Sequence, residues 1–289
     1  MTGPSTGTDA ARWRSVLFVP GDRPELAPKA LRCGPDVVVL DLEDAVPPAG
    51  KVAAREAVRA SVAALVGQVR VGVRVNPPGT EWYADDVMGL PEGVDAVVVP
   101  KLDTPSQLAA VADAVGGRPV VAGLETVRGA LDARLVLGPP VVACYFGAED
   151  YVADLGGTRT SHNAEVAYPR AHVAAAARLA GVPALDMVTI DFRDHDRFAA
   201  EARDARALGY AGKLCIHPDQ VALAHEAFRP SADEVAWATE LLAAFDEAGG
   251  RTIAFAGQMV DEVVAARARA VLTTAAADAP VGTPAAPTD

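Results

Sequence analysis

Residues 119–150 read PVVAGLETVRGALDARLVLGPPVVACYFGAED, and this stretch decides the fold. It contains two apolar runs, 119–124 and 141–146, which are continuous rather than alternating. Continuous runs of this length are typical of strands that are buried on both faces of a parallel sheet. The segment between them, 127–137, is rich in Ala, Leu and Arg, which favour a helix. The stretch is therefore expected to form a strand, a helix and a second strand parallel to the first.

The same alternation runs through most of the chain. We expect strands at 15–19, 36–42, 69–75, 94–99, 119–124, 141–146, 186–191 and 213–216. We expect Ala-rich amphipathic helices at 24–33, 51–66, 105–115, 127–137, 164–180 and 197–208. Eight strands with intervening helices in 289 residues predict a closed (β/α)8 barrel, the TIM barrel fold. An open doubly wound sheet is the alternative, but no Gly-x-Gly-x-x-Gly motif follows any expected strand.

The chain continues past what eight β/α units need. Residues 231–248 and 261–272 have helical composition, and a Gly-Gly pair and a short apolar segment separate them. Such an extension could pack on the barrel or reach a neighbouring subunit. The ends of the chain have the composition of disordered segments. The expected division is a barrel at 12–230, a C-terminal helical extension or lid at 231–272, and disordered ends at 1–11 and 273–289.

The composition limits the class of protein. A hydrophobic content of 51% with 22% charged residues suits a globular enzyme with a full core. The net charge of −12 argues against nucleic acid or an anionic membrane surface as the main partner. The three cysteines, Cys33, Cys144 and Cys215, lie in or beside apolar runs without metal-type spacing, so we expect reduced thiols in a cytoplasmic protein. No signal peptide or membrane-spanning run is expected.

Two acidic residues follow the two apolar runs quoted above. If both runs are parallel strands, Glu125 and Asp150 lie at the same edge of one sheet. Two carboxylates there make half of a site for a hard divalent cation such as Mg²⁺, or Mn²⁺, with substrate oxygens and waters completing the shell. The alternative is that each acid caps the helix after its strand.

Polar residues follow nearly every other expected strand, and active sites of TIM barrels lie at that end. Arg74 could form an ion pair with Asp41 or Glu43, or hold a substrate carboxylate with its planar fork. Asp41, Glu43 and Asp44 form an acidic cluster. One of these residues is expected to orient Arg74 or a metal-bound water. We expect Lys101 to pair with these acids. His217 is expected to start a helix and hydrogen-bond locally rather than act as a base.

Ordered motifs give the chain a family resemblance. The motifs are SVLFVPGDRPE at 15–25, VLDLEDAV at 39–46, RVNP at 74–77, VPK at 99–101, LET at 124–126, FGAED at 146–150, GKLCIHP at 212–218 and GQMVD at 257–261. Over residues 14–272 they resemble the citrate lyase β-subunit-like proteins and malyl-CoA lyases of the HpcH/HpaI aldolase superfamily. The resemblance implies a TIM barrel that assembles as a homotrimer or a dimer of trimers.

The resemblance also implies roles for particular residues. Glu125 and Asp150 would bind Mg²⁺, and Arg74 would grip the substrate carboxylate. Asp261 would close over a neighbour's active site and serve in acid–base chemistry, with Glu43 and Asp44 as further catalytic candidates. The positions expected to contact substrate or CoA are Phe18, Arg23, Lys29, Ile216 and His217, together with Arg74 and Glu125.

These roles imply a Mg²⁺-dependent carbon–carbon lyase. It would cleave or form a 3-hydroxy-carboxyacyl-CoA such as malyl-, citramalyl- or citryl-CoA, giving an acyl-CoA and an α-keto acid. One alternative is a metal-dependent aldolase on free hydroxy-keto acids. Another is a citrate lyase β subunit that is active only with a carrier-protein partner. Hydrolysis of the thioester also stays open.

Overall fold

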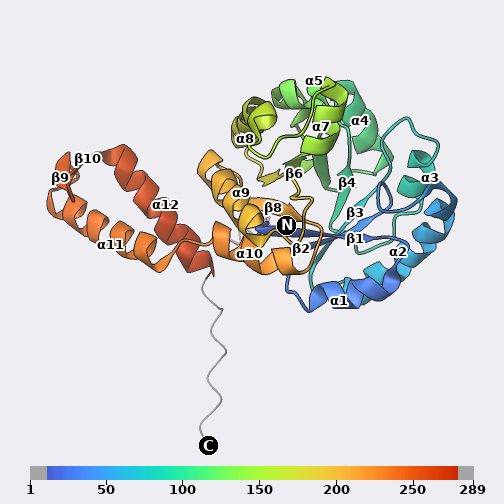
Figure 1. Ribbon diagram of the computed structural model, residues 1–289, viewed down its shortest axis with the longest axis horizontal. Coiled ribbons are helices and arrows are strands. Elements are labelled where there is room, and N and C mark those ends of the chain that lie inside the picture. Colours follow the sequence, from blue (N-terminus) through green and yellow to red (C-terminus); the bar gives the residue numbers. More distant parts are fainter. Residues whose placement is uncertain (1–11, 279–289) are drawn as a thin grey trace, which may run out of the picture. The chain divides into compact units, whose positions relative to one another are not determined.

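Eight parallel strands close into a barrel in the computed structural model, which describes residues 12–278 (Figure 1). The strands are β1 Ser15–Pro20, β2 Val37–Asp41, β3 Arg70–Arg74, β4 Ala96–Val99, β5 Val120–Leu124, β6 Val141–Phe146, β7 Ala184–Asp186 and β8 Gly212–Cys215. Each strand pairs with the next, and β8 closes the ring by pairing Leu214 with Val16 of β1. The expected TIM barrel is therefore confirmed.

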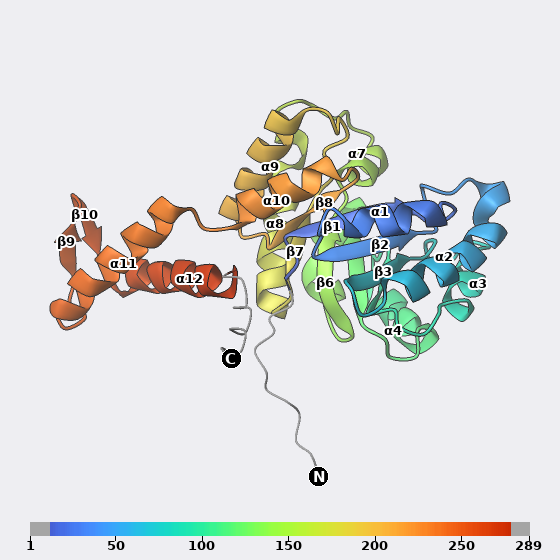
Figure 2. The ribbon, with the colours of Figure 1, turned by 90° about the horizontal axis from the view of Figure 1, so that it is seen from below.

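Helices surround this barrel (Figures 1 and 2). They are η1 Pro24–Leu26, α1 Ala27–Leu31, η2 Pro48–Gly50, α2 Lys51–Leu65, α3 Tyr83–Met88, α4 Pro105–Ala114, α5 Val127–Leu131, α6 Ala133–Val136, α7 Ala148–Leu155, η3 Ala164–Val166, α8 Ala167–Ala180, α9 His195–Leu208 and α10 Asp219–Phe228. Helix α2 illustrates their packing. Its buried residues Ala54, Val58, Val62 and Leu65 recur every three or four positions, so they form one face.

The strands bury both of their faces. On β2, Val37 and Val39 belong to the core inside the barrel, whereas Val38 and Leu40 belong to the core beneath the helices. Both layers are apolar, which explains why the strands read as continuous Val and Leu runs rather than as alternating patterns.

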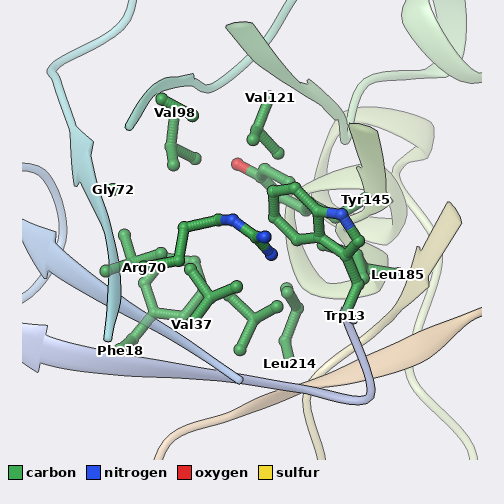
Figure 3. Close-up of a pocket in the computed structure, with 13 residues that line it drawn as sticks. Trp13, Phe18, Val37, Arg70, Gly72, Val98, Val121, Tyr145, Leu185 and Leu214 are labelled. Carbon is green, nitrogen blue, oxygen red and sulfur yellow. The ribbon is translucent and has the colours of Figure 1, made fainter. Parts of the chain in front are cut away.

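The inside of the barrel is packed (Figure 3). Its cavity measures about 10 Å³ and is lined by inward-facing residues, among which Arg70 places its guanidinium over the ring of Trp13. This volume is at most enough for one water. A substrate therefore has to bind at an end of the barrel.

One strand lies earlier than expected. We expected 186–191, but β7 is Ala184–Asp186 and only its last residue falls in that range. The reason is a buried lysine on β8: Lys213 Nζ donates to Asp186 Oδ2 at 2.9 Å and to the Met187 carbonyl at 2.7 Å. The Met187 carbonyl is thereby bonded to a side chain instead of continuing the ladder.

The helices differ from expectation in three places. Residues 127–137 form two short helices, α5 and α6, because the chain turns at Asp132. Helix α7, which follows β6, and the short α3 were not among the expected helices, whereas α10 begins at Asp219, two residues after His217, which was expected to start a helix. Helix α7 matters most, since it carries Glu149 and Asp150 in its first turn.

The second unit begins at Arg229, close to the expected boundary. It consists of α11 Ala232–Glu247, a hairpin of β9 Ile253–Phe255 and β10 Gln258–Val260, and α12 Glu262–Asp278. Its own small core includes Leu241, Phe245 and Val260. The expected apolar segment at 251–257 is therefore part of an antiparallel hairpin.

The expected disordered tail began too early. Residues 273–278 belong to α12, because their Ala-rich sequence favours a helix and the hydroxyls of Thr273 and Thr274 bond to the carbonyls four residues before. The other ends expected to be disordered, 1–11 and 279–289, lie outside the described residues.

Two expectations about composition can be compared with the structure. All three cysteines are free thiols, and Cys144 and Cys215 are buried. Within residues 12–278, no helix is both long and apolar enough to cross a membrane.

Candidate active site

The inward register of the strands carries charged residues to the C-terminal mouth of the barrel. Val39 of β2 and Val121 of β5 face the interior, and Asp41 and Glu125 follow them by two and four residues. Because side chains alternate along a strand, even spacings keep both carboxyl groups on the inward face. Arg74 is the register partner of Asp41 on β3 and joins the same set.

Arg74 is held by acidic residues. Its Nε and Nη2 each donate to Asp41 at 2.7 Å, and its Nη1 lies 2.9 Å from Glu43 Oε2. Asp44 is 3.3 Å from Nη2, and the guanidinium lies 5.0 Å from the centre of the Phe18 ring. The expected ion pair is thus present, and it fixes the guanidinium plane. Although burial opposes its charge, Asp41 raises the pKa of Arg74 well above its ordinary value.

Lys101 lies between further acids, as expected. Its Nζ is 3.2 Å from Glu43 Oε1 and 3.1 Å from Asp150 Oδ1. Its backbone N–H donates to Glu125 Oε1 at 3.2 Å. Lys101 adopts a φ of 55°, a left-handed conformation that is uncommon outside glycine. Backbone strain of this kind often occurs at functional sites.

Glu125 is a buried acid in an acidic neighbourhood. It is 2% exposed, and burial, followed by the charge of Glu43, raises its pKa. Burial raises the pKa of Glu43 as well. Gly147 leaves room for Glu125, since a Cβ there would lie 2.6 Å from Oε2.

This donor set fits a hard divalent cation. Glu125 and Asp150 offer carboxylate oxygens, which such cations prefer, at one edge of the barrel. The positive charge of a bound metal would also reduce the repulsion from neighbouring acids that raises the pKa of Glu125. Among residues 12–278, no group of three or more acidic, His or Cys side chains is arranged to hold a metal. Two protein carboxylates would therefore need substrate oxygens and water to complete the coordination, as the sequence suggested.

A cavity of about 370 Å³ opens beside these groups. Its lining includes Asp41, Arg74, Asp150 and the apolar side chains of Phe18 and Ile216. The size and the mixture of an apolar wall with convergent charges are typical of small-molecule sites.

Three expected substrate contacts lie toward the outside of this site. Arg23, just before η1, and Lys29 of α1 are exposed, and neither is among the residues that line this cavity in the described chain. His217 stacks on Phe192 with ring centres 4.7 Å apart. Its Nδ1 accepts from the Asp219 N–H at 3.3 Å, the local hydrogen bond that was expected.

Comparison with known proteins places the chain in a family. The model of the family described as HpcH/HpaI aldolase/citrate lyase matches residues 14–218. The chain belongs to this family. A citrate lyase subunit beta-like protein of Deinococcus radiodurans is 47% identical over 274 residues, which cover 90% of this chain and 96% of that protein. The mitochondrial citramalyl-CoA lyase of Homo sapiens is 31% identical over 289 residues, covering 91% and 85% of the two chains.

A solved structure of the HpcH/HpaI family agrees with the fold. CitE from Mycobacterium tuberculosis, in complex with magnesium, acetoacetate and coenzyme A, matches with a TM-score of 0.82 and 38% identity. The match covers 92% of this chain and 99% of that one. The resemblance read from the motifs is confirmed, and the chain is a lyase-family enzyme of the citrate lyase β-like type.

Asp261, the remaining residue that the family resemblance selected, lies in the second unit. It follows β10 and precedes α12, and its Oδ1 accepts from the N–H groups of Val263 and Val264 at 3.0 and 3.1 Å. The carboxylate therefore caps the helix and is held in a defined orientation at the end of the hairpin.

Sequence reasoning missed the residues that support Glu43. Lys51, the first residue of α2, is 4% exposed, and its Nζ donates to the carbonyls of Leu42 and Glu43, both at 2.7 Å, and to Asn76 Oδ1 at 2.8 Å. Asn76 in turn donates to Asp86 at 2.6 Å. The sequence contained a possible signal for Lys51, which lies eight residues after Glu43. A lysine in the first turn of a helix is unfavourable for the helix dipole, so its presence there indicates another role.

Proposed function

We propose that this protein is a Mg²⁺-dependent lyase that cleaves or forms the carbon–carbon bond of a 3-hydroxy-carboxyacyl-CoA. Malyl-, citramalyl- and citryl-CoA are the candidate substrates, and the products of cleavage are an α-keto acid and an acyl-CoA. The observation that carries the proposal is that Arg74 and Asp150 line one cavity, while Lys101 joins Asp150 to the buried Glu125 beside it. The ligands of the CitE relative, magnesium, acetoacetate and coenzyme A, support it.

Glu125 and Asp150 would hold the metal. When bound, Mg²⁺ would act as a Lewis acid toward the oxygens of the substrate. Mn²⁺ has similar ligand preferences and is the natural substitute. Both acids lie on the barrel unit.

Arg74 would orient the substrate carboxylate. Its side chain lines the cavity, with Nε and Nη2 held by Asp41 and Nη1 beside Glu43. A guanidinium fixed in this way suits a carboxylate, which it can bind at two points. Phe18, whose ring centre lies 5.0 Å from the guanidinium, would exclude water from this contact.

The reaction is a retro-Claisen cleavage in the forward direction. The hydroxyl group on the carbon that bears the carboxylate loses its proton, and its C–O bond becomes the keto group. The bond to the thioester α-carbon breaks, and its electron pair stays on that carbon as the enolate of the acyl-CoA. Asp261 would give this carbon a proton, and in the condensation direction it would take one.

The hydroxyl proton needs an acceptor at the mouth. Glu43 is our candidate, because its Oε2 is buried and accepts no well-oriented hydrogen bond even though Arg74 lies close to it. Asp44, which is exposed at the same mouth, would help to hold Arg74.

The CoA portion would bind outside the acidic mouth. Arg23 and Lys29 are exposed basic residues on a chain of net charge −12, and they would supply the local positive charge that a polyanionic CoA requires. Ile216, which lines the cavity, and His217 follow β8, and both would contact the acyl portion.

A product screen tests this function. The purified chain with Mg²⁺ would be incubated with acetyl-CoA or propionyl-CoA and with glyoxylate, pyruvate or oxaloacetate, and the thioesters analysed by mass. We expect at least one pair to give the condensed hydroxyacyl-CoA, and Glu125→Gln protein to give none. Turnover of free hydroxy-keto acids without any thioester would instead show an aldolase. Activity only on a carrier-protein thioester would show a subunit of a larger complex, and release of free CoA alone would show a thioesterase.

A further inference from the structure

Lysine is rare in this chain, and three of its four lysines make polar contacts with their side chains. The sequence has four lysines and 22 arginines. Lys51 and Lys213 are buried in polar networks, and Lys29 is exposed on α1. Lys101, with a side chain that is 32% exposed, is the lysine that touches the candidate metal ligands.

Lys101 contacts three carboxylates at once. Its backbone N–H reaches Glu125 at 3.2 Å, while its ammonium lies 3.2 Å from Glu43 and 3.1 Å from Asp150. The left-handed φ of 55° turns the amide toward one acid while the side chain reaches the others. A non-glycine residue accepts such a backbone only where its surroundings hold it there.

Arg74, a second cation of the mouth, already pairs with other acids. Arg74 forms ion pairs with Asp41, Glu43 and Asp44. The ammonium of Lys101, 3.1 Å from Oδ1, is a cationic partner of Asp150. The charges of Glu43, Glu125 and Asp150 outweigh burial and raise the pKa of Lys101, which supports an ammonium at this place.

We propose that Lys101 is the internal counter-ion of these carboxylates and competes with the divalent metal for Asp150. The inference rests on the proposed metal site of Glu125 and Asp150. An ammonium 3.1 Å from Asp150 Oδ1 repels a cation bound to the same carboxylate, because like charges at such distances interact strongly in a partly buried site. Metal binding then displaces the ammonium from Asp150, while Glu43 retains it.

The consequence is that Lys101 weakens metal affinity. It offsets the repulsion among the acids, and part of the energy of metal binding is used to break the Lys101–Asp150 contact. A protein with a neutral side chain of similar length at position 101 should therefore bind the metal more tightly. If Lys101 only positioned the ligands, the same replacement should make the protein bind the metal less tightly.

Calorimetric titration of Mg²⁺ into the full-length chain separates these cases, since it needs no substrate or turnover. Lys101→Met removes the charge and keeps the length, and we expect its Mg²⁺ dissociation constant to fall about tenfold, a change of about 1.4 kcal/mol. Lys101→Arg keeps the charge and should stay within about threefold of the wild type. Arg178→Met, on the exposed face of α8, is the matched control for lost net charge and should bind Mg²⁺ like the wild type.

An unchanged or weaker Mg²⁺ affinity in Lys101→Met would overturn the competition. If that variant does not fold, the wild-type protein can be tested instead. Its lysines are acylated and the extent of modification at each is measured by mass mapping, with exposed Lys29 as the internal reference. Mg²⁺ should raise the reactivity of Lys101 relative to Lys29, and no rise would contradict displacement. A wild type without Mg²⁺ affinity would reject the metal site itself, whereas a failed product screen with normal Mg²⁺ binding would reject only the proposed reaction.

Discussion

Crowding of like charges is the defining feature of the site at the scale of single residues. Asp41, Glu43, Asp44, Glu125 and Asp150 share the mouth of the barrel with two cations. Such an excess of carboxylates costs stability unless a further cation is bound there, because each acid raises the cost of charging its neighbours. Binding of a divalent ion at the mouth would offset this repulsion and would explain the excess of carboxylates.

The first prediction concerns the two ligands. Glu125→Gln and Asp150→Asn each replace a charged oxygen by a neutral amide, and we expect each change to weaken Mg²⁺ binding and turnover by at least about 100-fold. The melting temperature should change little or rise, since the substitutions relieve repulsion at the rim. Titration calorimetry, activity and thermal melts measure these effects, with exposed Glu92→Gln as the control. Wild-type activity in either variant after treatment with EDTA would show that the site is wrong.

Arg74 gives the second prediction. A lysine cannot reproduce its two bonds to Asp41 and also face a substrate carboxylate. Loss of one such contact in a desolvated site costs roughly 2–5 kcal/mol. We therefore expect Arg74→Lys to lower kcat/KM by about one to four orders of magnitude, with the loss appearing against the keto acid and not in CoA affinity.

The contrasting variant is Arg23→Ala, which should weaken the affinity for acyl-CoA and spare the keto acid. If the Arg74→Lys protein has a lower melting temperature but retains its kcat/KM, Arg74 serves only as the structural partner of Asp41. Because Asp41 is 1% exposed, some loss of stability is expected in any case.

At the scale of elements, a buried polar network joins β7, β8 and the helices around them. Asp186 of β7 accepts from Arg170 at 2.7 Å and from Lys213 at 2.9 Å. Glu201 of α9 accepts from Thr189 at 2.6 Å and from Arg197 at 3.0 Å. This network takes the place of apolar packing where β7 is only three residues long.

The third prediction is that this network makes the barrel sensitive to acid. Although burial opposes its charge, Lys213 and the hydrogen bonds of Thr189, Asn163 and Arg197 lower the pKa of Glu201 from 4.5 to about 2. A lowered folded pKa means that the stabilisation is present above the unfolded pKa and is lost as pH falls from about 5 toward 2. It amounts to at most about 3 kcal/mol at neutral pH.

Urea unfolding at several pH values measures this effect. Glu201→Gln should be less stable than the wild type at pH 7, and the difference should shrink as the pH approaches 3. Exposed Glu226→Gln is the matched control and should follow the wild type throughout. A difference that does not vary with pH would assign the effect to packing rather than to the charge of Glu201.

The elements also show what the sequence could and could not predict. Seven strands agree closely, and all of these except β8 contain the Val-rich runs that identify doubly buried strands by local composition. Strand β7 was misplaced because a long-range bond from Lys213 ends it. Helix α7 was not among the expected helices, although one reading had Asp150 capping a helix after its strand. The cap is Gly147, and Glu149 and Asp150 lie in the first turn, where acids favour the dipole.

The candidate site was predictable to a similar extent. The strand-end positions of Glu125, Arg74 and Lys101 follow from strand periodicity and could be read from the chain. The support of Glu43 by Lys51 could not, because it depends on α2 packing against the loop after β2. The family motifs supplied Asp261, which no local pattern identifies as functional.

At the scale of the whole molecule, the candidate catalytic groups are divided between two units. The barrel unit carries the carboxylates and Arg74, and the second unit carries Asp261 at the end of a short hairpin with its own core. We propose that the chain assembles as a homotrimer or a dimer of trimers and that Asp261 serves a neighbouring barrel.

The last prediction tests that division of labour by subunit mixing. Asp261→Ala protein lacks the proton donor and Glu125→Gln protein lacks a metal ligand, so each should be inactive alone. If a site takes its barrel from one chain and Asp261 from the next in a cyclic oligomer, random exchange restores about a quarter of the sites, because each partner is intact with a chance of about one half. Activity after exchange, with mixed oligomers verified by mass, is the measurement. No recovery in such oligomers would mean that one chain completes its own site, and an active monomer would lead to the same conclusion.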